Sequence, residues 1–397
     1  MPFSLVAEQP KQLTGREESA LLQRAIAQRE SPAIRLKLAQ LNNRLDMFGE
    51  AIELLDTAGP PADFATARTL FTALMGRGQR ADLERAVRMA EQGETLADCH
   101  FTRAEALEIQ AEALLRLGED SRAEPLLERA LEFDRANDPA FRMLSGLWLK
   151  RGEADRVLAL AEQIEAAGSG HSQLLGIMTM ALTQRGDLPA AHALVGLDRF
   201  LFTVTPPAPA GWPDLPSFHA ALARELFDSP GLRDGRHGTA SVESLRVDEP
   251  ATAATPAFRA LQELIVDHVA RIAAGLPEDG HPWLRMRPAS AQLRIWSVIT
   301  GPEGRERWHM HPLGWASGGY YVEVPDRVQH GNSPAGCLEF GLPDYRIGQA
   351  AAATFGSRLV RPQPGLLTLF PSHAYHQTHP HGAEGRRICV AFDLIPA

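Results

Sequence analysis

The chain has 397 residues, of which 44% are hydrophobic and 22% are charged, and its formal net charge is −9 at pH 7. This composition is typical of a globular protein with two or three domains and excludes a disordered or fibrous chain. The acidic balance, without a basic stripe, argues against a nucleic-acid partner. The longest apolar stretches, such as 177–182 and 365–370, fall far short of the roughly 20 residues of a membrane-spanning helix, so no membrane span is expected.

The N-terminal segment and the cysteines indicate a compartment. The first residues lack a basic region followed by an apolar core, so they do not resemble a secretory signal. Cys99, Cys337 and Cys389 are odd in number and widely spaced, which offers neither a disulfide framework nor a CxxC metal knuckle. We therefore expect a soluble protein of the cytoplasm.

Residues 16–194 have apolar positions at helical spacing and almost no β-branched runs, which predicts an all-helical region. Three turn signals within it centre on Gly118, Gly152 and Gly186, which are 34 residues apart. A period of 34 residues with a helix on each side of the turn is that of the tetratricopeptide repeat. Two looser copies precede them, at Arg77-Gly78 and at Leu45-Asp46.

Small residues follow these turns where paired helices must approach, as at Ala123 and Ala191, whereas Val157 breaks the pattern in the middle repeat. Stacked repeats of this kind form a superhelix with a groove, and such a groove commonly holds a peptide or protein. The repeats could instead support the following domain or form a homodimer. We expect a peptide or protein partner and leave the oligomeric state open.

The pattern changes after Gly196, where a strand from Phe200 runs into a proline-rich turn that no helix can continue through. We predict a helical repeat domain over residues 1–196 and a second domain over residues 197–397. Two helices, 217–227 and 255–274, open the second domain. Beyond them we expect strands and turns only, in a sandwich or barrel. The strands are predicted at 292–300, 319–325, 336–340, 365–370 and 387–394.

Half of the fourteen histidines fall in this C-terminal β region, and this clustering indicates a metal site. His309 and His311 are two residues apart, so on an extended segment both side chains point to the same face and can share one ion. A third ligand is available in the histidine-rich segment 373–381. Neutral imidazole suits Fe(II), Zn, Cu or Ni, so the ligand type alone does not choose the metal.

Two sequence blocks carry a resemblance to a known family. The first runs from His309-Met-His311-Pro312 into Ser317-Gly-Gly-Tyr320-Tyr321-Val, and the second from Phe370-Pro-Ser372 through His376 to Arg387. Over about residues 199–396, the chain resembles the 2-oxoglutarate- and Fe(II)-dependent oxygenases that often follow tetratricopeptide repeats. The resemblance implies a double-stranded β-helix, a jelly-roll or cupin-like fold.

The resemblance also implies roles for individual residues. His309, His311 and His376 would be the iron ligands, and Arg387 would bind the distal carboxylate of 2-oxoglutarate. Three protein ligands leave the remaining positions of Fe(II) open for a bidentate 2-oxo acid and for O2. The expected function is an Fe(II)- and 2-oxoglutarate-dependent dioxygenase that hydroxylates a peptide or protein.

Arginine suits a carboxylate because its planar fork donates two parallel charge-assisted hydrogen bonds. Arg386 competes with Arg387 for this role, but strand alternation points the two side chains to opposite faces, and Arg387 is preferred. Tyr320 and Tyr321 are candidates for binding the co-substrate or lining its pocket. Arg294 and Trp296 alternate on the strand before the histidine pair and are weaker candidates for facing the pocket.

The remaining histidines, His281, His330, His373 and His379, are taken as surface or core residues. The usual ligand triad of the superfamily has two histidines and one carboxylate, whereas this chain has His311 in the carboxylate's place, so its role as a ligand stays open. Glu323 and Asp326 lie too far along the chain to replace the carboxylate by simple spacing.

Aspartyl/asparaginyl β-hydroxylases, which also join helical repeats to such an oxygenase, likewise lack the carboxylate ligand. Three-histidine iron sites occur in cupin-type dioxygenases that use no 2-oxoglutarate, which is an alternative interpretation. A third is a non-catalytic repeat scaffold.

Overall fold

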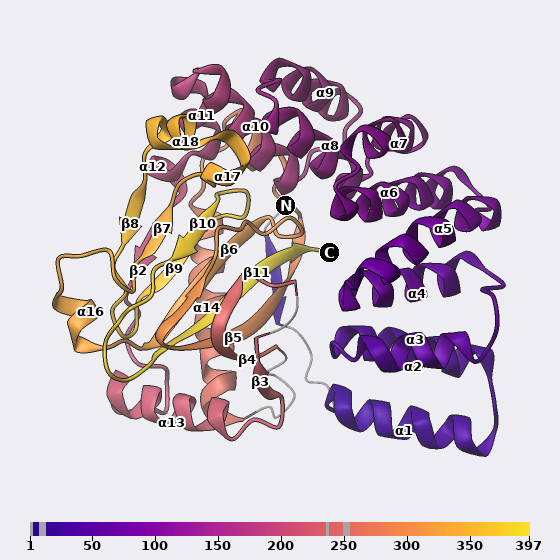
Figure 1. Ribbon diagram of the computed structural model, residues 1–397. Helices are drawn as coiled ribbons and strands as arrows, with labels where there is room; N and C mark the ends of the chain where they lie inside the picture. Colours follow the sequence, from indigo (N-terminus) through magenta and orange to yellow (C-terminus); the bar gives the residue numbers. More distant parts are fainter. Residues whose placement is uncertain (1–2, 8–12, 236–237, 249–254) are drawn as a thin grey trace. The chain divides into compact units, whose positions relative to one another are not determined.

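The computed structural model describes residues 3–7, 13–235, 238–248 and 255–397 (Figure 1). The chain divides into two compact units. One comprises residues 13–151 and 162–169, and the other comprises residues 1–12, 152–161 and 170–397. In the described part of the chain, no helix combines the length and the apolar character needed to cross a bilayer.

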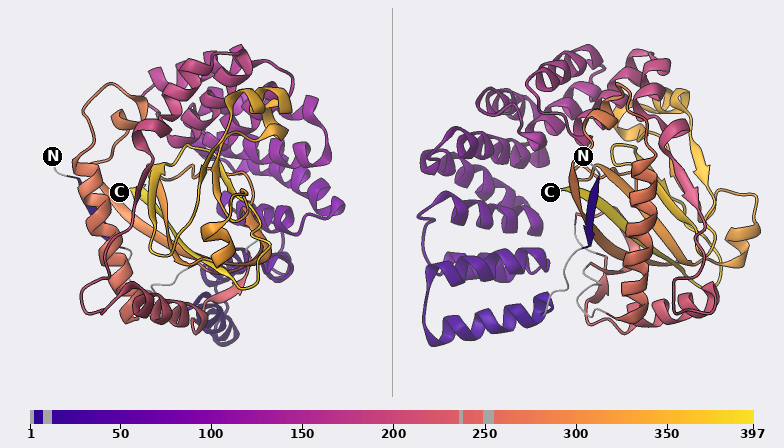
Figure 2. Two further views of the ribbon diagram at one scale, coloured as in Figure 1. Left: turned by 90° about the vertical axis from the view of Figure 1, so that its left-hand side faces the viewer. Right: turned by 180° about the vertical axis from the view of Figure 1, so that it is seen from behind.

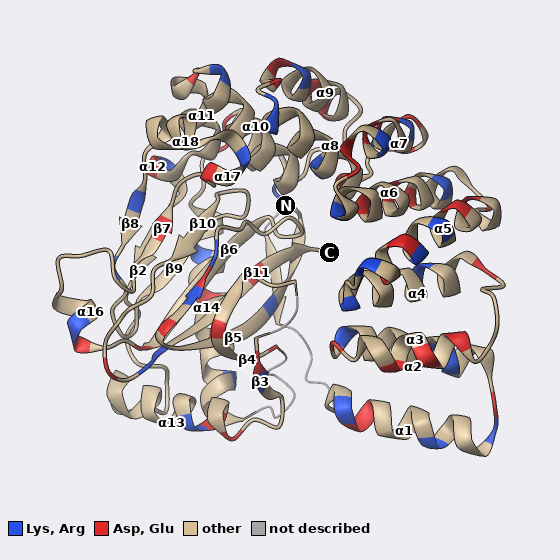
Figure 3. Ribbon diagram, in the orientation of Figure 1, with Lys and Arg blue, Asp and Glu red and all other residues tan. Residues whose placement is uncertain are grey.

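Helices alone build the first unit. They are α1 (Gly15–Gln28), α2 (Pro32–Arg44), α3 (Phe48–Asp56), α4 (Phe64–Arg77), α5 (Arg80–Leu96), α6 (His100–Leu117), α7 (Asp120–Phe133) and α8 (Asp138–Lys150). Each packs against the next along the chain, and Figure 3 shows acidic and basic residues interspersed along them. The helices α9 (Ala154–Ala166), α10 (Ser172–Arg185) and α11 (Leu188–Val195) continue the series.

The repeat signals of the sequence all coincide with turns between paired helices. Gly118, Gly152 and Gly186 have φ angles of 81°, 77° and 90°, in the left-handed region that glycine adopts without steric cost. The looser copies share this conformation, with φ of 68° at Gly78 and 61° at Asp46. The turn residue of each repeat therefore stands where the backbone must adopt a left-handed conformation, at the end of the first helix of each pair.

The small residues after these turns lie between paired helices. Ala51, Ala123, Val157 and Ala191 each follow the turn residue by five positions, and all are 0% exposed. The valine that interrupts the alanine pattern is buried like its counterparts. The predicted tetratricopeptide-like region is confirmed.

Two β-sheets form the core of the second unit. The larger has the strand order β2 (Phe202–Val204), β9 (Leu367–Pro371), β6 (Ala316–Glu323), β11 (Arg387–Pro396), β5 (Ser290–Glu306), β4 (Ser241–Val247) and β3 (Leu232–Asp234), with β1 (Ser4–Ala7) pairing parallel to β5. The smaller has the order β10 (His376–Thr378), β7 (Leu338–Phe340) and β8 (Arg358–Val360). An isolated bridge joins His309 to His376. The chain is thus a multidomain α and β protein, with helical repeats followed by a double-stranded β-helix.

The two predicted helices of this unit are present. Helix α13 (Leu215–Phe227) begins after Asp214, whose carboxylate accepts a hydrogen bond from the Ser217 amide at 2.7 Å. Helix α14 (Pro256–Ala274) has proline in its first turn, where no amide donor is needed. Helix α14 packs against β1 and α13 packs against β6, so both support the large sheet (Figure 2).

The expectation of only strands and turns beyond residue 274 is wrong. Short helices α15 (Pro282–Arg285), α16 (Asp326–His330), α17 (Asp344–Ile347) and α18 (Gln349–Phe355) interrupt the strands, and α12 (Leu197–Phe200) precedes β2. Three of these begin at or directly after a proline, which presets the helical φ angle for a single turn. A helix of one or two turns is too short to show a hydrophobic period in the sequence.

The last helix pair of the repeats belongs to the same compact unit as the sheets. Helix α10 packs on α15, α17 and α18, and helix α11 packs on α18. The Ser172 hydroxyl of α10 donates a hydrogen bond of 2.5 Å to the backbone oxygen of Gly314, close to His311 in the chain. The predicted boundary at residues 196 and 197 remains a proposal about which parts fold separately.

Candidate metal centre

Three histidines from two segments meet between the sheets. His309 and His311 lie in the extended segment that follows β5, and His376 is the first residue of β10. The backbones of His309 and His376 exchange two hydrogen bonds of 2.9 Å, which hold the segments side by side. One ring nitrogen from each of the three residues lies within 4.8 Å of the others, and the Nε2 atoms of His311 and His376 are 3.3 Å apart.

The other nitrogen of each ring, Nδ1, donates a hydrogen bond to an oxygen acceptor. The three acceptors are the backbone oxygens of Arg307 (2.7 Å from His309) and Ala374 (2.9 Å from His376) and the carboxylate of Asp393 (2.8 Å from His311). Such an acceptor keeps the ring proton on Nδ1 and leaves the Nε2 lone pair free. The arrangement is therefore that of three preoriented imidazole ligands.

Burial favours the ligand form of these rings. It lowers the pKa of His309 to about 3, and the neighbouring His311 contributes to this lowering. Burial likewise lowers the pKa of His376 well below its ordinary value. Neutral imidazole is the form that binds a metal ion, so the residues fit a divalent transition metal such as Fe(II).

A cavity of about 220 Å³ opens at the three histidines and is lined from both sheets. Trp296 of β5 forms part of its wall, with its ring stacked on His311 at a centroid distance of 5.6 Å. Apolar wall residues include Val298, Leu338 and Phe370. A small, largely apolar cavity beside a metal cluster is suited to a small organic ligand.

Arg387, the first residue of β11, lies in the wall of the same cavity and is only 3% exposed. Its guanidinium donates one hydrogen bond of 2.8 Å to the Gly336 oxygen and another of 3.0 Å to the Thr378 hydroxyl. An arginine has five N–H donors in a planar fork, so these two bonds orient it with donors to spare. Arg386 lies on the other face, where it pairs with Glu323 at 2.9 Å.

The two candidate tyrosines are placed differently. Tyr321 lines the cavity, and burial raises the pKa of its hydroxyl. Tyr320 is the preceding residue of β6 and points to the opposite face, where its hydroxyl lies 2.8 Å from Nε2 of His219 in α13. The structure therefore brings Tyr321 to the cavity and does not bring Tyr320 there.

The other histidines lie outside the cluster. His373 bonds the Leu194 oxygen, His281 bonds the Ala193 oxygen, His330 bonds the Asp326 oxygen, and His379 bonds Glu339. Of the weaker candidates on β5, Trp296 reaches the cavity, whereas Arg294 is exposed.

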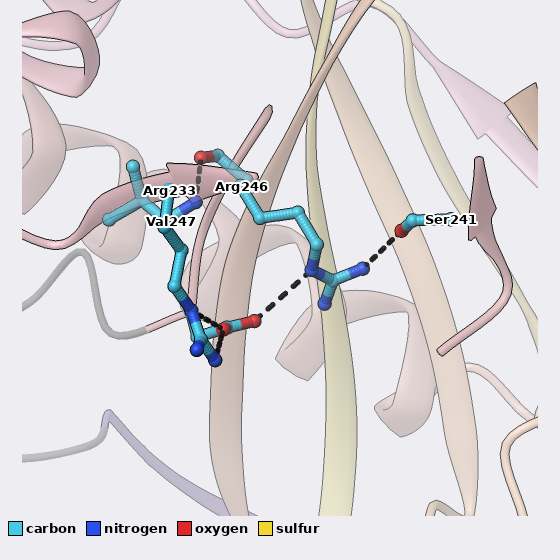
Figure 4. A network of polar contacts seen from close by, with 6 residues as sticks. Arg233, Ser241, Arg246 and Val247 are labelled. Carbon is cyan, nitrogen blue, oxygen red and sulfur yellow. Dashed lines mark hydrogen bonds and ion pairs between the residues drawn. The ribbon is translucent and has the colours of Figure 1, made fainter. Parts of the chain in front are cut away.

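Sequence reasoning missed two charged groups at the cavity, Arg246 of β4 and Glu306 of β5. The Arg246 guanidinium donates to the Ser241 hydroxyl at 2.7 Å and to the Asp248 carboxylate at 3.1 Å (Figure 4). The Oε1 atom of Glu306 is buried and has no hydrogen-bond partner among the described residues, and burial raises the pKa of this carboxyl group. Strand β4 was not predicted, so no sequence signal pointed to Arg246.

Sequence reasoning also missed Asp393. Arg387, Cys389 and Ala391 alternate along β11 and all line the cavity, and Asp393 continues this series. Period-two alternation from Arg387 was a signal that could have found it.

Comparisons with known proteins agree with this placement. Residues 294–393 match the model of a family whose description is "Putative 2OG-Fe(II) oxygenase". A search of curated protein sequences gave no match. Similar solved structures include a prolyl-4-hydroxylase of Pseudomonas putida, with 17% identity, 52% of this chain and 98% of that chain covered, and a TM-score of 0.33.

Two further solved structures each resemble part of the chain. The non-heme alpha-ketoglutarate-dependent epimerase SnoN from nogalamycin biosynthesis has 15% identity, 54% and 82% coverage of this chain and its own, and a TM-score of 0.36. A thermophilic TPR protein of Thermus thermophilus has 21% identity, 45% and 90% coverage, and a TM-score of 0.33. The three histidines and Arg387 all lie within the residues that match the family model.

Proposed function

We propose that this chain is an Fe(II)- and 2-oxoglutarate-dependent dioxygenase that hydroxylates a peptide or protein substrate. The observation that carries the proposal is the presence of three converging histidine Nε2 atoms and a buried arginine guanidinium in one cavity of about 220 Å³. A metal ion and a dicarboxylate co-substrate need these two kinds of group together.

His309, His311 and His376 are assigned as the residues that hold Fe(II). Their backbone and carboxylate acceptors fix each ring, so metal binding requires little reordering of side chains. When bound, Fe(II) with 2-oxoglutarate and O2 would supply the oxidising chemistry: the co-substrate loses CO2 and takes up one oxygen atom to become succinate, and the substrate takes up the other. The protein then contributes geometry, and no side chain is required as an acid or base.

Arg387 is assigned to the distal carboxylate of 2-oxoglutarate. The bonds to Gly336 and Thr378 hold its planar fork in place before the co-substrate arrives. Tyr321 is assigned to the wall of the same pocket, and Tyr320 to the packing of α13 on β6. The apolar residues Val298, Leu338 and Phe370 would keep bulk water from the bound co-substrate.

The peptide or protein substrate is proposed from the helical repeats, whose stacked pairs commonly present a binding groove. One specific observation favours a second function, a three-histidine dioxygenase that uses no 2-oxoglutarate. Among the residues that the structure describes, the donor set within 4.8 Å consists of histidines alone. A non-catalytic scaffold, the third interpretation, would bind neither iron nor 2-oxoglutarate.

The test is an anaerobic titration of the Fe(II)-loaded protein with 2-oxoglutarate, followed by the metal-to-ligand charge-transfer band in the visible spectrum. We expect a band in the natural protein and none in His376→Ala. Iron binding without a band would favour the second function, and absence of iron binding would favour the scaffold.

A further inference from the structure

A chain of hydrogen bonds ends on the side of His311 that faces away from the other two histidines. The Asp393 carboxylate accepts from Nδ1 of His311 at 2.8 Å and from the Ser317 hydroxyl at 2.6 Å, both at Oδ1. The Ser317 and Ser372 hydroxyl oxygens are 2.6 Å apart. Since the single proton of Ser317 is committed to Asp393, Ser372 must donate to Ser317. The order of donation is therefore Ser372 to Ser317 to Asp393.

The same chain closes on the backbone of His311. The His311 amide donates a hydrogen bond of 3.0 Å to the backbone oxygen of Ser372. Ser372 is therefore the first residue of the hydrogen-bond chain and also contacts His311, the last. Gly314 makes room for it, because a Cβ there would stand 2.5 Å from the Ser372 hydroxyl oxygen. Segments that are remote in sequence thus converge on one imidazole. Ser317 and Ser372 are the serines of the two sequence blocks, and the proposed oxygenase chemistry gives neither serine a role.

The Asp393 carboxylate is buried together with the two serines of the chain. Asp393 is 8% exposed, Ser317 is 1% exposed and Ser372 is 0% exposed. A buried carboxylate is costly unless its partners donate to it, and here the donors are a hydroxyl group and the imidazole itself. A carboxylate on the far nitrogen of a metal-binding histidine fixes the ring and raises the basicity of the nitrogen that binds.

We propose that Asp393 is a positioning residue for the metal centre, supplying through His311 the negative charge that a carboxylate ligand would otherwise bring. Ser317 and Ser372 hold Asp393 in place. The Asp393 carboxylate does not bind the metal ion itself. It lies behind the His311 ring, and His311 is the ligand that transmits its charge. This inference rests on the proposed function only for the presence of a metal ion and not for 2-oxoglutarate.

The proposal has a consequence that a purely structural role for Asp393 does not share. If Asp393 acts through the His311 ring, a carboxylate at position 311 supplies the charge directly and removes the ring nitrogen that Asp393 contacts. The substitution Asp393→Asn should therefore weaken metal binding strongly in the natural background and far less in the His311→Asp background.

The experiment measures the affinity of the full-length, metal-free protein for Co(II), by competition with a chromophoric chelator and without 2-oxoglutarate. In the natural background, Asp393→Asn should weaken Co(II) binding about 10- to 100-fold. In the His311→Asp background, where the imidazole that contacts Asp393 is gone, the same change should weaken Co(II) binding by no more than about twofold. The visible absorption of bound Co(II) should also change with Asp393→Asn, since it reports the field of the ligands.

Asp326→Asn, on the exposed helix α16, is the matched control and should leave the Co(II) affinity unchanged. An unchanged affinity in Asp393→Asn, or an equal loss in both backgrounds, would overturn the proposal. If Asp393→Asn does not fold by circular dichroism, Ser317→Ala keeps both His311 and Asp393 and should weaken Co(II) binding severalfold. No effect of Ser317→Ala would then overturn it.

Failure of this inference is distinguishable from failure of the proposed function. A natural protein that binds no Co(II) refutes the metal centre and the oxygenase with it. If the protein binds Co(II) and Asp393→Asn leaves its affinity unchanged, only the role of Asp393 is refuted. If Asp393→Asn weakens Co(II) binding as expected but 2-oxoglutarate gives no charge-transfer band, only the oxygenase is refuted.

Discussion

Gly176 in helix α10 lies directly against the backbone carbonyl of His373, three residues before His376. A Cβ at Gly176 would stand 3.2 Å from that oxygen and 3.3 Å from the Tyr375 ring. These contacts are closer than most side chains tolerate, so the glycine allows the helix to approach the segment that carries His376. The last repeat thus supports the histidine cluster through its backbone.

We expect Gly176→Ala to lower the free energy of unfolding by about 1 kcal/mol, because the backbone carbonyl can yield little space. At Gly146, in helix α8, a Cβ would meet no described atom within 4 Å beyond its chain neighbours and the backbone of its own helix, so it is the matched control. There Gly146→Ala should stabilise the protein by about 0.5–1 kcal/mol through helix propensity alone. Thermal unfolding of the two metal-free variants checks the prediction, and equal stabilisation in both would refute it.

Arg387→Ala should weaken 2-oxoglutarate binding about 30- to 100-fold while leaving the iron content unchanged. The physical reason is the loss of charge-assisted hydrogen bonds to the distal carboxylate, which are worth about 2–3 kcal/mol. Arg386→Ala removes a guanidinium that pairs with Glu323 on the other face and should have no such effect. The measurement is the anaerobic titration described above. A normal titration curve for Arg387→Ala would reject its assignment.

Tyr320→Phe and Tyr321→Phe should separate stability from binding. Removing the Tyr320 hydroxyl leaves Nε2 of His219 without its partner, and we expect a loss of about 1 kcal/mol in unfolding free energy with normal 2-oxoglutarate affinity. Tyr321→Phe alters the cavity wall and should weaken 2-oxoglutarate binding instead. Urea unfolding and co-substrate titration of both variants decide the point. The reverse pattern would contradict the placement of these roles.

Glu108 should make the helical unit less stable at alkaline pH. It is 8% exposed in helix α6, and burial, assisted by Glu112 and Glu105, raises its pKa to about 8. Its pKa in the unfolded chain is near the ordinary value of 4.5, so folding favours the protonated form and stability falls as the pH rises between these values.

Glu108→Gln should therefore raise the free energy of unfolding by about 2–4 kcal/mol at pH 8 and by little at about pH 4.5. Urea unfolding followed by helical circular dichroism at the two pH values measures this. Glu84→Gln, at an exposed residue of α5 in the same unit that pairs with Arg80, is the control and should change the free energy of unfolding by less than about 1 kcal/mol at both pH values. A gain of equal size at both pH values in Glu108→Gln would show that the effect is not one of ionisation.

The helical repeats could be predicted from the order of the residues, because their signals are local. A turn that needs a left-handed residue, such as Gly118 or Gly186, constrains only its own backbone, and the buried Ala123 and Ala191 follow it at a fixed helical distance. Strand alternation is local in the same way, and it predicted that Arg386 and Arg387 point to opposite faces. Spacing likewise predicted that His309 and His311 share a face.

Contacts between residues that are distant in the chain could not be predicted in this way, because they depend on how the strands and helices pack. Asp393 reaches His311 because β11 pairs with β6 and so brings Asp393 beside Ser317, a register that no local pattern specifies. The packing of α10 on the segment before His376, and the choice between Tyr320 and Tyr321, depend in the same way on neighbours remote in sequence. Local periodicity acts over a few residues, whereas strand register and helix docking are set by the burial of whole faces against one another.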